Sequence, residues 1–203
     1  MIYALPGMGA DKRVFPGAWQ QVANVKFVEW APYVSARSIP ELAAAIVEGE
    51  SMEDGDSIIG TSLGGMVACE ISKILRIDRL VLVASAVTKD EVSRLLALLG
   101  PLAPMAPLRF VQAVSTSVPA ELARMFEGAD ERFIQSMCRA IFEWEGLGVG
   151  NSGLIRIHGK SDLVIRHPGE ADLTVDGGHM IAMTHAAECV AFLERMAPEV
   201  FKR

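Results

Sequence analysis

The sequence predicts an α/β protein in which helices flank a mostly parallel sheet of about six strands. Short apolar runs are followed by turn residues and then by segments with helical spacing, and this order recurs along the chain. Several runs consist almost wholly of Ile, Val and Leu, as expected of strands that helices cover on both faces. From residue 88 to about residue 150 the strand pattern stops, which predicts an all-helical insertion.

The expected elements can be placed in chain order. The candidate strands are residues 2–5, 25–30, 57–59, 80–84, 154–158 and 172–175. Two helices begin at capping boxes, in which a Ser or Thr and a Glu three residues later satisfy free backbone N–H groups. "SIPE" at 38–41 opens a helix expected to end near Gly49, and "TKDE" at 88–91 opens one expected to reach Gly100.

The insertion divides the predicted domain, with 1–87 and 151–203 forming the α/β core and 88–150 a helical cap. Prolines break the cap into short helices, and its apolar side chains exceed what a solvent-facing connection needs. We interpret these side chains partly as the core of the cap and partly as the wall of a pocket, where methionine adapts to varied ligands. They are Met105, Met125, Met137, Phe110, Phe126, Phe133 and Phe142.

Composition excludes several classes of function. A net charge of −6, with no cluster of Lys and Arg, leaves no basic surface for nucleic acid. No apolar run reaches the ~18 residues of a membrane span, and no signal peptide precedes the first strand, so we expect a cytoplasmic protein. Cys69, Cys138 and Cys189 lack metal-ligand spacing and are interpreted as buried thiols, so no metal site is expected.

A serine lies between glycines in "GTSLG" at 60–64, where an apolar run passes into a helical pattern. This GxSxG spacing, between strand and helix, is typical of a tight turn that exposes a nucleophilic hydroxyl. Ser62 would then stand at a helix N-terminus, where free N–H groups stabilise a developing oxyanion. The structural alternative is that Ser62 only caps the helix.

A nucleophilic serine needs a base, and His179 is the best candidate of the four histidines. It follows a predicted strand and two glycines in "DGGHM", whereas His158 is interpreted as a structural residue at a strand end. His167 and His185 are interpreted as loop and solvated residues. The carboxylate that orients the base is assigned to Asp162, after the strand at 154–158, with Asp172 and Asp176 as alternatives.

The order Ser, Asp, His, each after its own strand, resembles that of the α/β-hydrolase superfamily, and the resemblance spans nearly the whole chain. It implies an oxyanion loop at "ALPGMGAD", with the backbone N–H groups of Met8 and Leu63 as donors. Where the family often has His-Gly, this chain has Pro6-Gly7. The family's leading antiparallel hairpin is also missing, and we expect a second copy of the chain to cover the sheet edge that this exposes.

The resemblance implies a serine hydrolase that cleaves an ester or thioester with an apolar group and needs no cofactor or metal. Related scaffolds also perform C–C bond cleavage, lyase chemistry and cofactor-free peroxidation, and some only bind ligands, so these functions stay open. A nucleotide-binding protein is not favoured, because Gly7 and Gly9 lack a third glycine at the required spacing.

Overall fold

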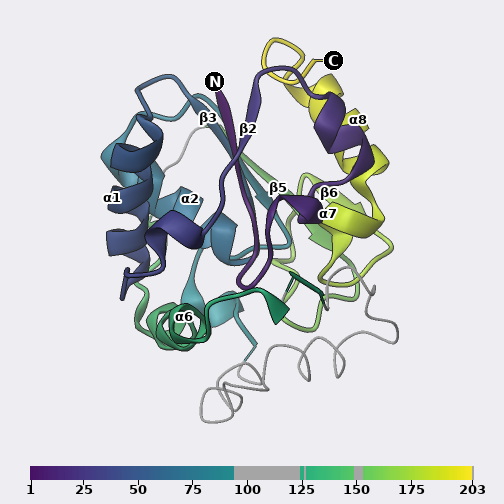
Figure 1. Ribbon diagram of the computed structural model, residues 1–203. Coiled ribbons are helices and arrows are strands. Elements are labelled where there is room, and N and C mark those ends of the chain that lie inside the picture. The colour runs from purple at the N-terminus through teal and green to yellow at the C-terminus, as the bar shows by residue number, and fades with distance from the viewer. Residues whose placement is uncertain (94–123, 126, 149–152, 203) are drawn as a thin grey trace.

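A parallel sheet of six strands organises the chain in this computed structural model, which describes residues 1–93, 124–125, 127–148 and 153–202 (Figure 1). The order across the sheet is β2-β1-β3-β4-β5-β6, and each neighbouring pair is parallel. The strands are β1 (Ile2–Leu5), β2 (Val25–Phe27), β3 (Ser57–Thr61), β4 (Leu80–Val83), β5 (Leu154–Gly159) and β6 (Leu173–Val175). The order reverses between β1 and β3, which in open α/β sheets is where ligands bind, beyond the carboxyl ends of the strands.

All six strands predicted from the sequence are present, with bounds that differ by at most two residues except in β2, which is three residues shorter than expected. β2 ends at Phe27, whereas its apolar run continues to Trp30. The backbone of Trp30 is already helical, because this residue caps the short 3-10 helix η3 (Ala31–Tyr33). Trp30 is buried, so its apolar character serves packing beyond the strand.

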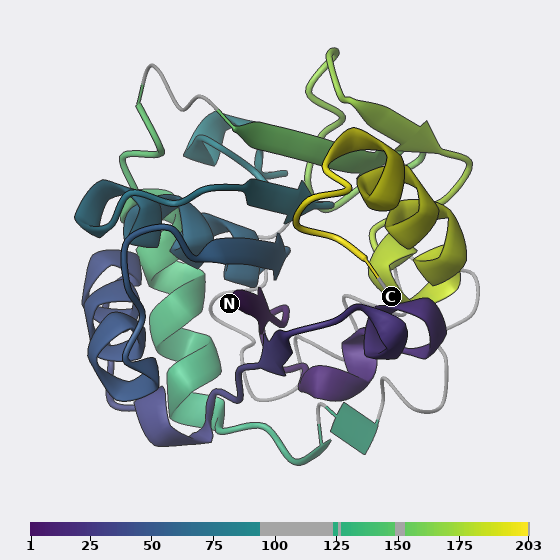
Figure 2. The same cartoon turned by 90° about the horizontal axis from the view of Figure 1, so that it is seen from above.

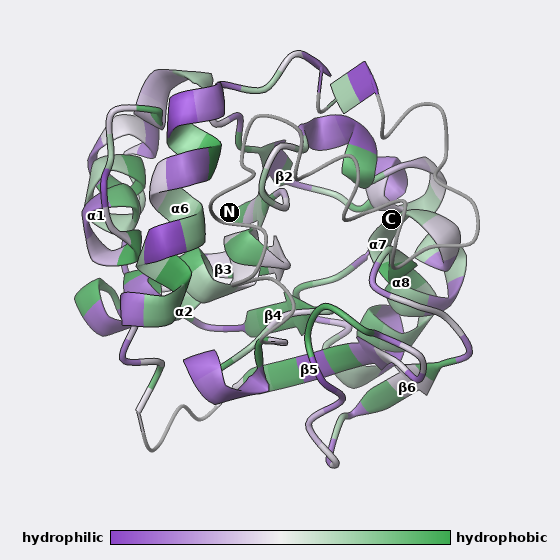
Figure 3. Cartoon of the chain, turned by 90° about the horizontal axis from the view of Figure 1, so that it is seen from below, coloured by the Kyte–Doolittle hydropathy of each residue, from purple (hydrophilic) through white to green (hydrophobic). Residues whose placement is uncertain are grey.

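Helices cover both faces of the sheet (Figures 1 and 2). One face carries α1 (Ile39–Glu50), α2 (Leu63–Ile74) and, beside α1, α6 (Glu131–Glu143). The other carries α7 (Ile181–Thr184), α8 (Ala186–Met196) and the 3-10 helix η2 (Gly17–Gln21). Successive strand residues supply the two cores alternately, as a period of two requires: Tyr3 and Leu5 pack on the α1 side, Ile2 and Ala4 on the α8 side. Figure 3 shows β4 as almost wholly hydrophobic, as burial on both faces demands.

The first capping box forms as predicted. Ser38 Oγ accepts a hydrogen bond of 3.2 Å from the backbone N–H of Glu41, and Pro40 lies in the first turn of α1. The Glu41 carboxylate accepts from the backbone N–H of Arg37, one residue before the cap. The helix runs to Glu50, one residue past the expected end.

The helix predicted to begin at the second capping box, at Thr88, does not form there. Residues Lys89–Glu91 form only a 3-10 turn, η4, and Val92 is extended in an antiparallel bridge with Ile165. The Glu91 carboxylate accepts the backbone N–H of Val87, as Glu41 accepts that of Arg37, but the Thr88 side chain makes no capping hydrogen bond. Both oxygens of Glu91 also pair with Arg156. Residues 94–100 of this predicted helix lie outside the described residues.

Only part of the predicted cap at 88–150 is described. Its described portion contains α6, which is capped by Asp130: the Asp130 carboxylate accepts the backbone N–H of Phe133. Phe133 and Met137 belong to the core on the α1 side and Met125 to the other, while Phe142 is partly buried against the first. The remaining apolar cap residues of the sequence prediction, Met105, Phe110 and Phe126, lie outside the described residues.

In the described ranges, no helix is long and apolar enough to cross a membrane. The same ranges hold no cluster of three or more His, Cys, Asp or Glu side chains suited to a metal ion. The three cysteines are free thiols. Burial raises the pKa of Cys69 and of Cys189 to about 12 and that of the partly buried Cys138 to about 11, so these thiols stay protonated at neutral pH.

Candidate active site

Ser62 stands in the turn between β3 and α2, at the carboxyl edge of the sheet. Its backbone has φ 53° and ψ −120°, a conformation that residues with a Cβ rarely adopt. Strain of this kind persists only where the surroundings fix it, and it concentrates at functional sites. The turn therefore has the backbone that the GxSxG spacing predicts.

The flanking glycines are required by the close packing of this turn. A Cβ on Gly60 would lie 2.4 Å from the carbonyl oxygen of Gly64, and one on Gly64 would lie 2.3 Å from that of Leu5. A Cβ on Gly65 would lie 2.3 Å from Ser85 Oγ. Each clash is with a neighbour that holds the turn in place, so larger residues would displace Ser62.

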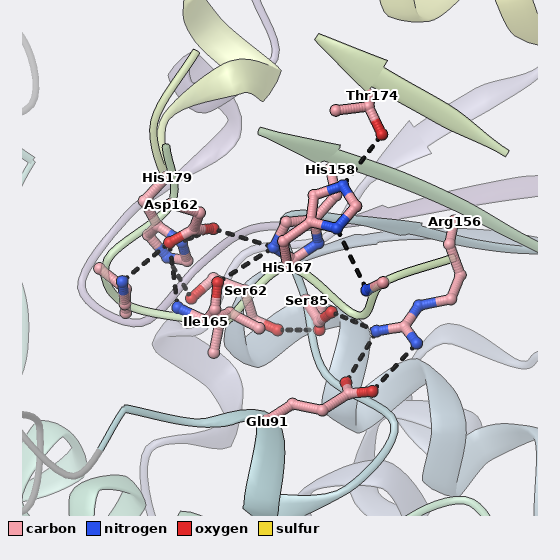
Figure 4. A network of polar contacts seen from close by, with 12 residues as sticks. Ser62, Ser85, Glu91, Arg156, His158, Asp162, Ile165, His167, Thr174 and His179 are labelled. Atoms are coloured by element: carbon pink, nitrogen blue, oxygen red, sulfur yellow. Dashed lines mark hydrogen bonds and ion pairs between the residues drawn. The ribbon is translucent and has the colours of Figure 1, made fainter. Parts of the chain in front are cut away.

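The structure brings the three predicted residues into one chain of hydrogen bonds (Figure 4). His179 Nε2 lies 2.9 Å from Ser62 Oγ, and His179 Nδ1 lies 2.8 Å from Asp162 Oδ2. An ionised carboxylate only accepts, so Nδ1 carries the proton and Nε2 is free to accept from the serine hydroxyl. This is the tautomer that a general base needs.

The loop that carries His179 can pass close to the end of β5 because Gly159 has no side chain there. It leaves β6 through Gly177 and Gly178, whose carbonyl oxygens pass close to the end of β5. A Cβ on Gly159 would lie 2.3 Å from the Gly178 oxygen and 2.6 Å from that of Gly177. The imidazole is thereby held between the two loops, with 14% of its side chain exposed.

Asp162 is fully enclosed by donors. Its Oδ1 accepts the backbone N–H groups of Val164 at 2.8 Å and Ile165 at 3.0 Å, and its Oδ2 faces His179. Burial alone would raise the pKa of the Asp162 carboxyl, but the charge and hydrogen bond of His179 and the two N–H groups outweigh it. The pKa of Asp162 lies below its usual value, so the carboxylate is ionised at neutral pH.

The alternative residues are engaged elsewhere. His167 Nε2 lies 2.9 Å from Thr174 Oγ1, and His185 Nδ1 lies 2.8 Å from Thr184 Oγ1. Asp172 accepts the backbone N–H of Arg156 between β5 and β6, and Asp176 is exposed. His158 is buried beside Asp162.

The predicted oxyanion loop lies against the serine. A Cβ on Gly7 would be 3.4 Å from Ser62 Cβ. The carbonyl oxygen of Gly7 accepts hydrogen bonds from the Trp30 indole at 2.9 Å and from the backbone of Ala10 at 3.1 Å. In a trans peptide the next N–H points opposite to that oxygen, so the N–H of Met8 is turned away from Trp30. Leu63, the other predicted donor, is the first residue of α2.

Sequence reasoning did not identify Ser85, which supports the turn from behind. Ser85 Oγ donates a 2.6 Å hydrogen bond to the carbonyl oxygen of Ser62, and the carbonyl of Ser85 accepts from Arg156 (Figure 4). The available signal is its position: it is the first polar residue after β4, at the same edge of the sheet.

Comparisons with solved structures find the same architecture over nearly the whole chain. A hydrolase from Oleispira antarctica superimposes with a TM-score of 0.71 at 15% identity, covering 95% of this chain and 90% of that one. N-acyl homoserine lactonase AidH, complexed with N-butanoyl homoserine, gives 0.69 at 14% identity over 98% and 89%. The type II thioesterase BorB from the borrelidin biosynthetic cluster gives 0.68 at 19% identity over 98% and 91%. The sequence matches no protein-family model and no curated protein.

Proposed function

Because the chain has the α/β-hydrolase fold, we propose that it is a serine hydrolase that cleaves a carboxylic ester or thioester bearing an apolar group. The observation that carries this proposal is the unbroken hydrogen-bond chain from Ser62 Oγ through His179 to Asp162. Fold alone does not fix an activity, so the argument depends on these side chains.

In the proposed first step, Ser62 Oγ attacks the carbonyl carbon of the substrate and His179 Nε2 takes the hydroxyl proton. The imidazolium that forms is stabilised by the ionised Asp162, which lies 2.8 Å from the opposite ring nitrogen. As the tetrahedral intermediate collapses, His179 returns the proton to the leaving alcohol or thiol. An acyl group remains on Ser62.

The negative charge that develops on the carbonyl oxygen needs fixed donors. We assign this role to the backbone N–H groups of Met8 and Leu63. The start of α2 supports the second donor, because the first N–H groups of a helix have no partner within the helix. The contact between Gly7 and Ser62 supports the first.

Water completes the cycle in the second half-reaction. His179 accepts a proton from the water, whose oxygen attacks the acyl carbon to form a second tetrahedral intermediate. As the bond from the acyl carbon to Ser62 Oγ breaks, His179 gives the proton to Oγ, which releases a carboxylic acid and restores the Ser62 hydroxyl. Each step uses only side-chain and backbone groups of this chain, so the proposed chemistry requires no cofactor or metal.

The choice of bond is supported by the similar structures, whose names describe an esterase, a lactonase and a thioesterase. Each of those activities transfers an acyl group from oxygen or sulfur to water. An apolar group is supported by Leu163, a residue 60% exposed directly after Asp162, and by Met8, which is partly buried and follows Gly7 in the loop against Ser62.

The test is hydrolysis of p-nitrophenyl esters of increasing acyl length, together with a matched series of acyl thioesters. We expect turnover by the wild type and a loss of at least about 10³-fold in Ser62→Ala and in His179→Ala, at equal folded concentration. The acyl length that gives the highest kcat/KM would show how long an acyl chain the site accommodates. Turnover that persists in folded Ser62→Ala would refute the assignment, and a wild type inactive on both series would favour the non-hydrolytic and ligand-binding alternatives.

A further inference from the structure

His158 is a buried polar side chain that the proposed reaction does not use. It lies in β5, four residues before Asp162, and is 1% exposed. Its Nε2 lies 3.0 Å from the carbonyl oxygen of Ile165 and 3.4 Å from Asp162 Oδ2 (Figure 4). Two histidines therefore face one oxygen of the same carboxylate, His179 from the solvent side and His158 from the interior.

The contact with Ile165 fixes the tautomer of His158. A carbonyl oxygen only accepts hydrogen bonds, so Nε2 of His158 must carry the proton. The same N–H is thereby held near Asp162 Oδ2. At 3.4 Å this second contact is longer than an ordinary hydrogen bond and acts as an attraction between a dipole and a charge.

The loop around Asp162 is closed through Ile165. The backbone N–H of Ile165 donates to Asp162 Oδ1, while its carbonyl oxygen accepts from His158. Ile165 thus links Asp162 to His158: its N–H binds the carboxylate and its carbonyl oxygen binds the imidazole. Removal of the His158 donor would free the Ile165 carbonyl and loosen the segment that orients the carboxylate.

We propose that His158 is a positioning residue, which holds the Asp162 carboxylate in register with His179 through the Ile165 carbonyl and its own Nε2–H. This inference rests on the proposed serine hydrolase function for its kinetic consequence. Its structural consequence, at the Asp162–His179 hydrogen bond, can be measured without substrate.

The role requires His158 to stay neutral, with one nitrogen protonated. The groups that face it are the Asp162 carboxylate, the His167 ring in an edge contact at 5.3 Å between centroids, and the Arg156 charge from the same strand. Burial lowers the pKa of His158, and the Ile165 and Asp162 contacts offset this only in part. The neutral form is therefore the one present at neutral pH.

The experiment compares His158→Phe, which removes the donor, with His158→Gln, whose amide can still reach the Ile165 carbonyl. His167→Gln is the matched control, since His167 touches the His158 ring and bonds Thr174 rather than Asp162. The first readout is the downfield proton resonance of the His179 Nδ1–H in each folded protein. The second is the pH profile of kcat/KM on the best ester.

We expect His158→Phe to shift the resonance and to lower kcat about tenfold, because the catalytic groups lose their alignment. The pH profile of its kcat/KM should also differ from that of the wild type, because the Asp162 carboxylate has lost a neighbouring donor. His158→Gln should return both readouts toward the wild type, and His167→Gln should match the wild type. If His158→Phe does not fold, His158→Asn replaces it, since its shorter amide cannot span to Ile165.

The inference would be overturned if the His179 Nδ1–H resonance and the pH profile of kcat/KM were the same in His158→Phe as in the wild type. Equal effects of the donor-free and glutamine variants would overturn it too, because the loss would then come from packing. The resonance separates this inference from the proposed function. A shifted resonance in a protein that cleaves no ester supports the positioning role and refutes only the hydrolase.

Discussion

The indole Nε1 of Trp30 donates a 2.9 Å hydrogen bond to the carbonyl oxygen of Gly7, within the loop that faces Ser62. Trp30 is buried, and its ring packs at 5.8 Å on Phe133 of α6. The bond fixes the orientation of the peptide between Gly7 and Met8. The donor that we assign to the oxyanion therefore depends on a side chain from the segment that follows β2.

Trp30→Phe should lower kcat about tenfold and leave KM nearly unchanged, because a misplaced oxyanion donor is missed mainly in the transition state. Phenylalanine keeps the ring that packs on Phe133 and loses only the N–H. The control is Trp144→Phe, which removes an indole bond of 2.6 Å to Glu70, away from the site. The test is to measure kcat and KM of both variants at equal folded concentration. Equal kcat values for the two variants would refute this role of Trp30.

Ser62→Gly and Ser62→Ala should both abolish turnover yet differ in stability. Alanine keeps a Cβ in the strained backbone of Ser62, whereas glycine adopts a positive φ without cost. We expect the glycine variant to be more stable by about 1 kcal/mol in urea unfolding, once the greater chain entropy of glycine is included. An alanine variant of equal or greater stability would show that the turn is unstrained.

Gly64→Ala should destabilise the fold by about 2–3 kcal/mol, because its Cβ would overlap the backbone oxygens of Leu5 and Pro6 at 2.3 and 2.5 Å. Those atoms belong to β1 and its loop and cannot rotate away. Gly128→Ala is the matched control, since its Cβ would meet nothing closer than 3.7 Å. Thermal unfolding of both variants tests the claim, and equal melting temperatures would contradict it.

Stability should fall as the pH drops below about 6.5, partly because of His158. The folded protein holds this side chain neutral, with its pKa lowered by burial, whereas the unfolded chain binds a proton near the ordinary histidine pKa. Below that pH the unfolded state holds more protons, so the free energy of unfolding decreases. Urea unfolding at about pH 7.5 and 5.5 should show a smaller pH dependence in His158→Gln than in the wild type. An equal dependence would mean that His158 is protonated in the folded state.

The central strands β1, β3 and β4 could be predicted from the sequence because burial on both faces leaves a run of mostly apolar residues. The position of Ser62 could be predicted because the glycine spacing reports a local backbone requirement. The helix at Thr88 was predicted wrongly, since Glu91 pairs with Arg156 across 65 positions of sequence and this tertiary contact overrides the local capping pattern.

The residues around the site were harder to predict for the same physical reason. His158 was interpreted as structural because nothing local shows that its Nε2 turns toward Asp162. Trp30 was counted as part of a strand, although its indole serves a loop 23 positions earlier. Contacts of this kind arise from packing between distant segments, which residue spacing does not encode.

The most direct test of the central claim is mass spectrometry of the protein after incubation with a fluorophosphonate. Attack by Ser62 Oγ forms a phosphorus–oxygen bond, fluoride leaves, and His179 takes the hydroxyl proton, so the modified serine keeps the label. The account predicts a single adduct on Ser62 in the wild type, none in Ser62→Ala, and much slower labelling in His179→Ala. A folded wild type that stays unlabelled, or carries the label on another residue, would contradict the assignment of Ser62 as an activated nucleophile.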